Sequence, residues 1–152
     1  MKAAAIPAAE LEADNPLNMV MEALGIEQGG WCPAGRLAED GSVPSRYDLT
    51  ETPSREYPVR TELNVIDSTA TLILYEKRLS GGTLLTERIC RRLHKEYMLA
   101  RLDRDDVEIV RIWLASLKPT TLNVAGPPQS TAPGSEQRAF EFLMQVFAHH
   151  QQ

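Results

Sequence analysis

The sequence predicts an α/β domain in which helices cover both faces of a mostly parallel sheet. A short apolar run of β-forming residues at 70–75 is typical of a buried strand. Apolar residues recur at helical spacing in two later segments: Leu85, Ile89 and Leu93 in one, and Val110, Trp113, Leu114 and Leu117 in the other. Because strands and helices alternate along the chain, we expect a doubly wound arrangement.

The first third of the chain offers few regular elements. Residues 1–16 are rich in alanine and have no clear period, so we expect a disordered or variable lead-in. A helix at 17–24 would end at Gly25, which can adopt the left-handed conformation that closes helices. Glycine and proline then recur through 29–45, which predicts a structured loop with a short strand near 28–31.

The rest of the chain alternates regularly, and residues 17–149 read as one ligand-binding domain. The expected elements are a helix at 54–65 capped by Ser54, the strand at 70–75, a helix at 84–94, a strand at 97–102, a helix that Asp103 caps and Pro119 ends, a strand at 121–124 and a helix at 135–149. Folds of this class bind ligands at the carboxyl ends of the strands.

Length and charge exclude several classes of protein. A chain of 152 residues can fold as one domain without a disulfide or a structural metal. Its net charge of −5 repels phosphate backbones, so we expect no nucleic-acid partner. No apolar run approaches the ~20 residues of a membrane-spanning helix, so we expect no membrane partner. Cys32 and Cys90 form no metal-binding pattern and suit a reducing, cytoplasmic location.

The clearest local signal for a binding site follows the strand at 70–75. Ser80, Gly81, Gly82 and Thr83 link this strand to a helix. Glycines let the backbone approach a ligand closely, and free N–H groups at a helix start attract anions. The turn could therefore hold a phosphate or another oxyanion. The alternative is a tight structural turn in which Thr83 caps the helix.

A second candidate is the loop around Trp31. Trp31 offers a stacking face, and Arg36 offers a guanidinium group for phosphate or carboxylate. Cys32 could be a metal ligand or a redox-sensitive thiol, or a small buried residue. Trp31 could equally anchor the loop on the core.

Weaker signals come from polar residues near the ends of other elements. These are Arg60, Asn64, Asp67 and Ser68, around the end of one helix, and Asn123 and Gly126, at the end of the last strand. Asp67 and Ser68 have an alternative role in closing the helix and its turn. We expect Gly81, Gly82, Arg36 and Asp67 to line one cleft.

Residues for conventional catalysis are few. His94, His149 and His150 form no metal-binding or nucleophile-activating pattern, so no metal site is predicted. Glu87 lies one turn into the helix that follows Gly81 and could act as a general acid or base. An acidic residue there would also complement the helix dipole.

Taken in order, several motifs resemble the putative molybdenum carrier family, which is grouped with the SLOG-type Rossmann-like domains. The motifs are Gly29-Gly30-Trp31-Cys32-Pro33, Gly35-Arg36, Ala38-Glu39-Asp40-Gly41, Leu49-Thr50-Glu51-Thr52-Pro53-Ser54, Arg60-Thr61-Glu62, Asn64-Val65, Asp67-Ser68, Ala70-Thr71-Leu72-Ile73-Leu74, Gly81-Gly82-Thr83, Thr86 and Asn123-Val124-Ala125-Gly126-Pro127. The resemblance covers about residues 17–147. It implies a three-layer Rossmann-like fold and binding of molybdenum cofactor (molybdopterin) or a related nucleotide-like ligand.

One departure concerns the start of the chain. Members of that family open with a strand and a Gly-Gly-Gln-Thr-Gly loop, and neither is visible in residues 1–16. We therefore expect the first strand to be missing. A missing strand would leave a neighbour in the sheet unpaired, which favours a homo-oligomer.

Three functions follow from these observations. The first is a non-catalytic carrier of a phosphate-containing ligand, bound by Trp31, Arg36, Arg60, Asn64, Asp67, Ser68, Gly81, Gly82, Thr83, Thr86, Asn123 and Gly126. The second is an enzyme similar to nucleoside-monophosphate phosphoribohydrolases, with Glu87 as its catalytic residue, although Leu84-Leu85 interrupts the motif of those enzymes. The third is an inactive, truncated paralogue.

Overall fold

The fold is taken from a computed structural model of the whole chain. The structure describes residues 2–5, 24, 28–29, 31–32, 37–38, 41–42, 50–51, 57–104, 106–126 and 134–150. Arg36 and the predicted starts of the helices at 17–24 and 54–65 lie outside the described residues.

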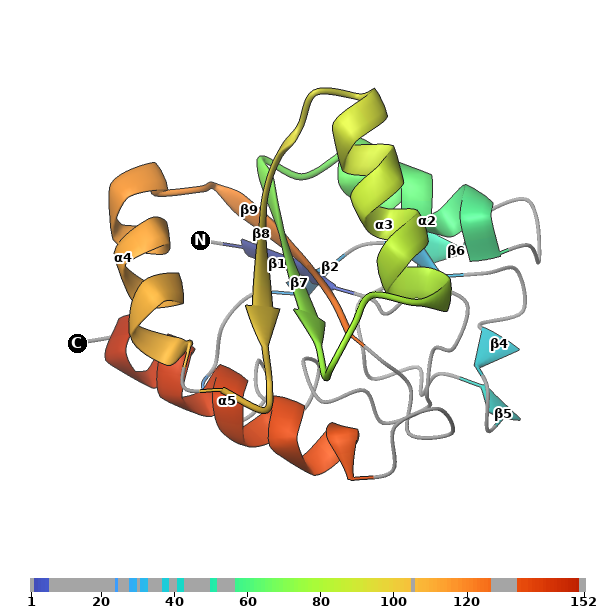
Figure 1. Cartoon of the computed structure of the whole chain (residues 1–152). Helices are drawn as coiled ribbons and strands as arrows, with labels where there is room; N and C mark the ends of the chain where they lie inside the picture. The colour runs from blue at the N-terminus through green and yellow to red at the C-terminus, as the bar shows by residue number, and fades with distance from the viewer. Residues whose placement is uncertain are drawn as a thin grey trace.

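The centre of the molecule is a five-stranded sheet in the order β2-β1-β9-β7-β8, with every neighbouring pair parallel (Figure 1). Its strands are β1 (Lys2–Ala5), β2 (Gln28–Gly29), β7 (Ala70–Tyr75), β8 (Glu96–Arg101) and β9 (Thr121–Ala125). Two small sheets accompany it: β3 (Trp31–Cys32) with β6 (Thr50–Glu51), and β4 (Leu37–Ala38) with β5 (Gly41–Ser42). The predicted buried strand at 70–75 is confirmed, and it lies inside the large sheet.

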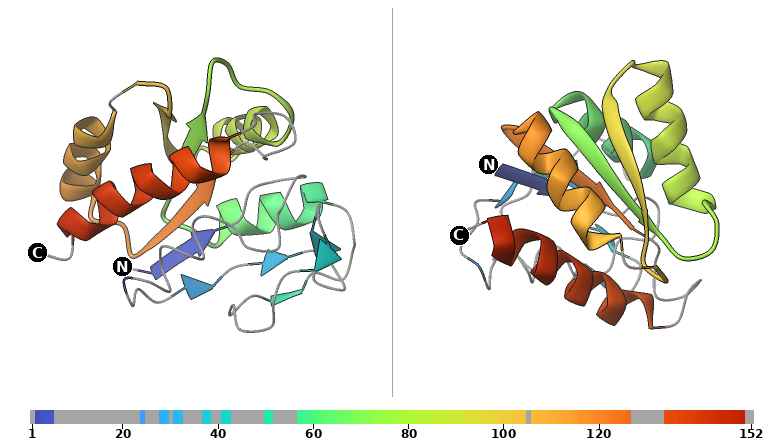
Figure 2. Two further views of the ribbon diagram at one scale, coloured as in Figure 1. Left: turned by 90° about the horizontal axis from the view of Figure 1, so that it is seen from below. Right: turned by 60° about the vertical axis from the view of Figure 1, so that its left-hand side comes forward.

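Four helices of the described ranges cover the two faces of the sheet. They are α2 (Tyr57–Ile66), α3 (Gly81–Arg92), α4 (Val107–Leu117) and α5 (Ser135–His150). The helix α3 carries the chain from β7 outward to β8, and α4 returns it past β7 to β9. Because such crossovers are right-handed, opposite directions of travel place the two helices on opposite faces. Figure 2 shows α4 and α5 on one side and α2 and α3 on the other, which confirms the doubly wound class.

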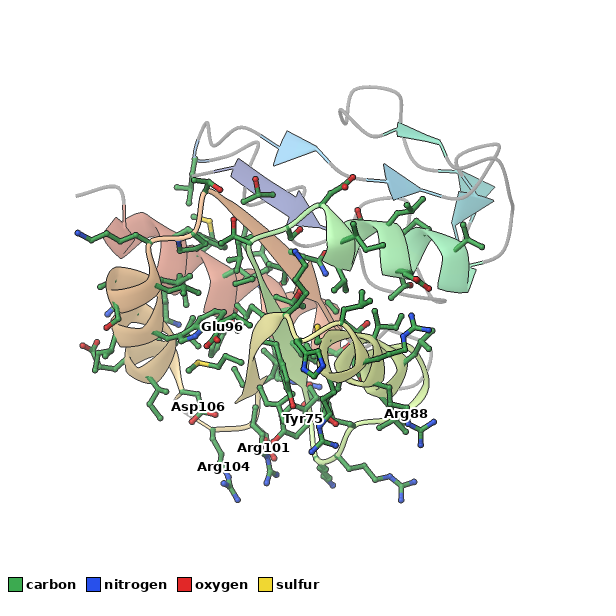
Figure 3. The ribbon with its side chains drawn as sticks, turned by 90° about the horizontal axis from the view of Figure 1, so that it is seen from above. Tyr75, Arg88, Glu96, Arg101, Arg104 and Asp106 are labelled. Atoms are coloured by element: carbon green, nitrogen blue, oxygen red, sulfur yellow. The ribbon has the colours of Figure 1, made fainter. Side chains whose placement is uncertain are left out.

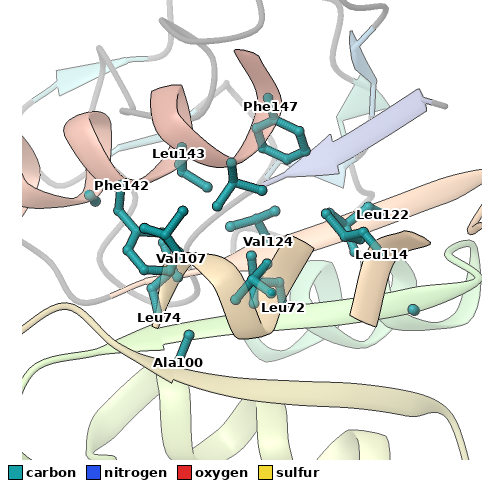
Figure 4. Packing of buried hydrophobic residues seen from close by; sticks show 14 residues of the cluster. Leu72, Leu74, Ala100, Val107, Leu114, Leu122, Val124, Phe142, Leu143 and Phe147 are labelled. Carbon is teal, nitrogen blue, oxygen red and sulfur yellow. The ribbon is translucent and has the colours of Figure 1, made fainter. Parts of the chain in front are cut away.

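The main hydrophobic core lies between the sheet and the α4/α5 layer (Figure 4). Side chains alternate along a strand, so Leu72 and Leu74 of β7 point to this layer together with Leu122 and Val124 of β9. The helices add Val110 and Leu114 from α4, and Phe142, Leu143, Val146 and Phe147 from α5. A smaller cluster, built on Val65, Ile89 and Cys90, lies under α2 and α3.

The expectation of a missing first strand is wrong. The strand β1 pairs with β9 from Lys2 opposite Thr121 to Ala5 opposite Val124, and it pairs with β2 on its other side. The strand next to it is therefore not left unpaired, and residues 2–5 are not part of a disordered lead-in. The alanines of this segment have weak β propensity, so the local sequence does not predict a strand. Pairing with β9 makes the segment a strand. Residues 6–16 lie outside the described residues.

Two predicted helix starts also differ from the structure. The helix α3 begins at Gly81 with Ser80 as its N-cap, so Thr83 is not the cap and the glycine pair belongs to the first turn. The helix α4 begins at Val107 after Asp106, because the predicted cap Asp103 instead binds Arg101 through both carboxylate oxygens. In each case a nearby polar partner competes with the expected cap.

Candidate functional site

The carboxyl ends of β7 and β9 lie side by side at one edge of the sheet. The strand β7 ends at Tyr75 and a short connection leads to Gly81, while β9 ends at Ala125 beside Ile73. Gly126 follows β9 next to β7, since a Cβ built on it would lie 3.9 Å from Cβ of Leu74. The start of α3 therefore lies at the edge where α/β folds bind their ligands.

The first turn of α3 is closed by threonine side chains. The Thr83 hydroxyl donates to the carbonyl oxygen of Ser80 (2.8 Å) and accepts from its N–H (3.2 Å). One turn on, the buried Thr86 hydroxyl donates to the carbonyl oxygen of Gly82 (2.8 Å). Both threonine hydroxyls are thus bonded to the backbone of the first turn, so Thr83 and Thr86 stabilise the conformation of the turn.

The two glycines open α3, with Gly81 exposed and Gly82 buried. Gly81 has a φ of 51°, a left-handed conformation that glycine adopts without a steric penalty. The N–H groups of Thr83 and Leu84 bind the carbonyl oxygen of Ser80. The N–H groups of Gly81 and Gly82 have no acceptor within the described part of the chain. Two donors therefore lie at the positive end of a helix, an arrangement that suits an oxyanion.

Behind this turn, the layer between the sheet and α2/α3 is polar. Eight of the nine buried polar residues in the described ranges belong to it: Arg60, Thr61, Asn64, Ser68, Thr71, Thr83, Thr86 and Asn123. Arg60 and Asn64 are both buried, one turn apart on α2. The structure therefore brings Arg60, Asn64 and Asn123 into the same layer as the start of α3.

Asn123 and Thr71 form a buried pair on neighbouring strands. They are opposite each other in the β7–β9 register, and Nδ2 of Asn123 donates to Oγ1 of Thr71 (3.3 Å). The Thr71 hydroxyl also interacts with the buried thiol of Cys90 on α3. Burial raises the pKa of Cys90, and the nearby Glu87 carboxylate raises it further, so the thiol stays protonated. Among the described residues, nothing donates a hydrogen bond to Oδ1 of Asn123.

Asp67 and Ser68 lie at the opposite edge of the sheet from Gly81 and Gly82. They connect the end of α2 to the first residue of β7, whereas Gly81 follows its last residue (Figure 1). The expectation of one cleft lined by Gly81, Gly82 and Asp67 is therefore wrong, because helices that cover a parallel sheet run against its strands. Ser68 closes α2 instead, donating to the carbonyl oxygen of Asn64 (2.6 Å).

Glu87 contacts β8 rather than the turn, and Trp31 belongs to one of the small sheets. The Glu87 carboxylate accepts a hydrogen bond from the hydroxyl of Tyr97 (3.4 Å), near the start of β8 and away from Gly81. Trp31 lies in β3, paired with Thr50. The position of Glu87 gives no support to a catalytic role at the turn.

Sequence reasoning missed a charged cluster at the same edge as the turn. Arg101 donates to the backbone of Glu76 (3.1 Å) and forms an ion pair with Asp103, and Arg138 of α5 binds the Glu76 carboxylate (2.7 Å). The Arg101 partner lowers the pKa of Asp103. Figure 3 shows Arg101 beside Tyr75, its partner in the β7–β8 register. The one sequence feature that could have predicted this charged cluster is the position of Arg101 near the end of a predicted strand.

Two features are absent from the described part of the chain. No helix there is long and apolar enough to span a membrane. No group of three or more His, Cys, Asp or Glu residues is arranged there to hold a metal ion.

Comparisons with known proteins identify the family. The model of the circularly permutated YpsA SLOG family matches residues 13–147. A crystal structure of a putative molybdenum carrier protein from Syntrophus aciditrophicus SB is 35% identical, with a TM-score of 0.86 over 95% of this chain and 93% of that one. No curated protein matches the chain. These matches confirm the family resemblance found in the motifs: the chain belongs to the circularly permutated YpsA SLOG family and has the fold of a molybdenum carrier-like SLOG protein.

Proposed function

We propose that this protein is a non-catalytic carrier that binds a phosphate-containing or oxyanionic ligand at the start of α3. The observation that carries the proposal is the pair of N–H groups of Gly81 and Gly82, at the carboxyl end of β7, for which the described part of the chain supplies no acceptor. A phosphate in front of this turn would accept hydrogen bonds from both groups and meet the positive end of the helix.

The name of the similar crystal structure suggests molybdenum cofactor as the ligand. The cofactor is a pterin that ends in a phosphate, and the turn fits that phosphate. The described residues offer no cluster of metal-binding side chains, so molybdenum would arrive within the cofactor or as the oxyanion molybdate. Gly81 and Gly82 would hold the anionic end of either form.

The polar layer behind the turn would serve the rest of the ligand. Arg60, Asn64 and Asn123 are buried there, and Asn123 keeps one carbonyl oxygen without a donor in the described chain. An amide oxygen of this kind suits the N–H or O–H groups of a pterin or a nucleotide. Trp31 and Arg36 belong to this proposal as the stacking face and the second positive charge.

Ser80 offers a test that leaves the fold intact. Aspartate and asparagine are both good N-caps, so Ser80→Asp and Ser80→Asn should both keep α3 folded. Only the aspartate adds a negative charge beside the bound anion. We expect Ser80→Asp to weaken ligand binding by at least about tenfold, because like charges at contact distance repel, and Ser80→Asn to bind as the wild type does.

Isothermal titration calorimetry with molybdenum cofactor, AMP, molybdate and inorganic phosphate would measure the effect. Tightest binding of the cofactor would identify a cofactor carrier, and tightest binding of AMP would identify a nucleotide carrier. Comparable binding of molybdate and phosphate alone would identify an oxyanion carrier. Failure of all four ligands to bind, or equal affinities of Ser80→Asp and Ser80→Asn, would contradict the proposal.

A further inference from the structure

Within the described part of the chain, the strand β8 has one unpaired side. It forms the end of the five-stranded sheet and pairs along its whole length with β7, its one partner among the described residues. An unpaired strand edge presents a row of N–H and C=O groups that can pair with another chain.

Two hydrogen bonds show which residues of β8 face outward. The N–H of Leu102, just after the strand, donates to Tyr75 of β7, whereas the N–H of Arg101 donates to the Asp106 side chain (3.0 Å). Backbone groups alternate in direction along a strand. Leu99 and Tyr97, which have the same parity as Arg101, therefore direct their N–H and C=O groups to the open side.

Asp106 limits the free edge at one end. Because its carboxylate already accepts from the N–H of Arg101, that group is not available for pairing. The free donors and acceptors are thus concentrated at Tyr97 and Leu99. Natural proteins block sheet edges with such side chains, and here the block leaves a short segment open.

Exposed apolar side chains surround this segment. Four large hydrophobic residues in the described ranges are exposed, and three of them belong to β8 and α4: Leu99 (37%), Ile109 (55%) and Ile112 (59%). On α4, Ile109 lies one turn before Trp113, whose indole N–H donates to Glu96 of β8 (3.3 Å). The flank of α4 that carries Ile109 and Trp113 therefore runs along the edge strand.

We propose that a second copy of this chain pairs with this edge, through antiparallel β8 strands related by a two-fold axis at Met98. In that register, Tyr97 of each copy lies opposite Leu99 of the other. The outward N–H and C=O groups of these residues form four hydrogen bonds, and none requires the blocked N–H of Arg101.

The register is self-complementary in its side chains as well. Tyr97 of one copy meets Leu99 of the other on the α3 side of the sheet, which is a favourable aromatic–aliphatic cross-strand pair. Met98 faces its own equivalent on the α4 side. A two-fold axis perpendicular to the sheet keeps each layer continuous, so it brings the apolar flanks of the two α4 helices together. A second copy satisfies backbone and apolar groups at once, which favours it over an unrelated extended peptide.

The first experiment measures mass in solution. Analytical ultracentrifugation of the full chain over a range of concentrations should show a dimer of about twice 16.9 kDa. Leu99→Lys places a charge at the centre of the interface and should give a monomer. Leu99→Pro removes an outward N–H, which an edge strand tolerates, and should also give a monomer. Ile66→Lys is the matched control, because Ile66 is comparably exposed (44%) and lies at the end of α2, outside β8 and α4.

The second experiment locates the interface. Hydrogen exchange should show the amides of Tyr97 and Leu99 protected in the dimer and exposed on dilution or in Leu99→Lys. The amides of Met98 and Ala100 face β7 and should stay protected throughout, which also shows that the variant is folded. A monomer at all concentrations, a dimeric Leu99→Lys, or a dimer whose Tyr97 and Leu99 amides exchange as fast as those of a monomer would overturn the proposal.

Discussion

The two faces of the sheet differ in what they bury. The face under α4 and α5 buries a continuous set of Leu, Val and Phe side chains. The face under α2 and α3 buries Arg60, Asn64, Thr71 and Asn123, with only a small apolar cluster beside them. Buried polar groups cost free energy unless they are paired, whereas apolar burial is favourable. We infer that the first face supplies most of the stability, and that the second retains its polar groups because they serve the ligand.

Two adjacent residues of the strand β7 face the apolar and the polar side of the sheet, respectively. Leu72 contributes to the α4/α5 core, and its neighbour Thr71 contributes a hydroxyl to the opposite layer. Substitutions at these two positions therefore test the two faces on the same strand and at the same depth.

The largest effect is expected from Leu72→Ala. Leu72 is fully buried, so truncation should lower the free energy of unfolding by about 2–5 kcal/mol in urea denaturation. Ligand affinity of the folded fraction should not change, since the start of α3 lies on the other face. Ile66→Ala, at an exposed position, serves as the control. A loss below about 1 kcal/mol would show that this face is not the main source of stability.

A smaller effect is expected from Thr71→Val. The side chains have the same shape, but valine leaves the Nδ2 group of Asn123 buried without its acceptor. The free energy of unfolding should fall by about 1–3 kcal/mol. The exposed Thr120→Val should change it by no more than about 0.5 kcal/mol. Equal stabilities of Thr71→Val and the wild type would mean that the hydrogen bond between the Asn123 amide and the Thr71 hydroxyl contributes nothing to the free energy of unfolding.

The smallest effect is a dependence on pH. Burial raises the pKa of Cys90 above its ordinary value of 9.0 in the folded protein. The contribution of the protonated Cys90 thiol to the free energy of unfolding is therefore complete below pH 9.0, and it is lost as the pH rises through the folded-state pKa. The stability difference between wild type and Cys90→Ala should shrink above pH 9.0 in denaturation experiments at several pH values. A constant difference would contradict this, since Glu87 and Lys95, which face the thiol, are present in both proteins.

The sequence predicts the fold well where the spacing of apolar residues indicates which side of an element is buried. The strand at 70–75 and the helices around Leu85–Leu93 and Val110–Leu117 carry periodic apolar residues, and all of them are present. The strand β1 could not be predicted, because four residues with three alanines carry no pattern and only the neighbouring β9 makes them a strand. For the site, Gly81 and Gly82 could be found from spacing. The separation of Asp67 from them depends on the direction of α2, which residue types do not encode.

We propose that the ligand binds at the start of α3, on the polar side of the sheet. Titration of ¹⁵N-labelled protein with AMP or molybdate, followed by amide chemical shifts, is the sharpest test of this position. We predict that the amides of Gly81 and Gly82 shift first and most, while those of α4 and α5 stay unchanged. Shifts centred on α4 and α5, or saturating binding that leaves Gly81 and Gly82 unperturbed, would contradict the claim.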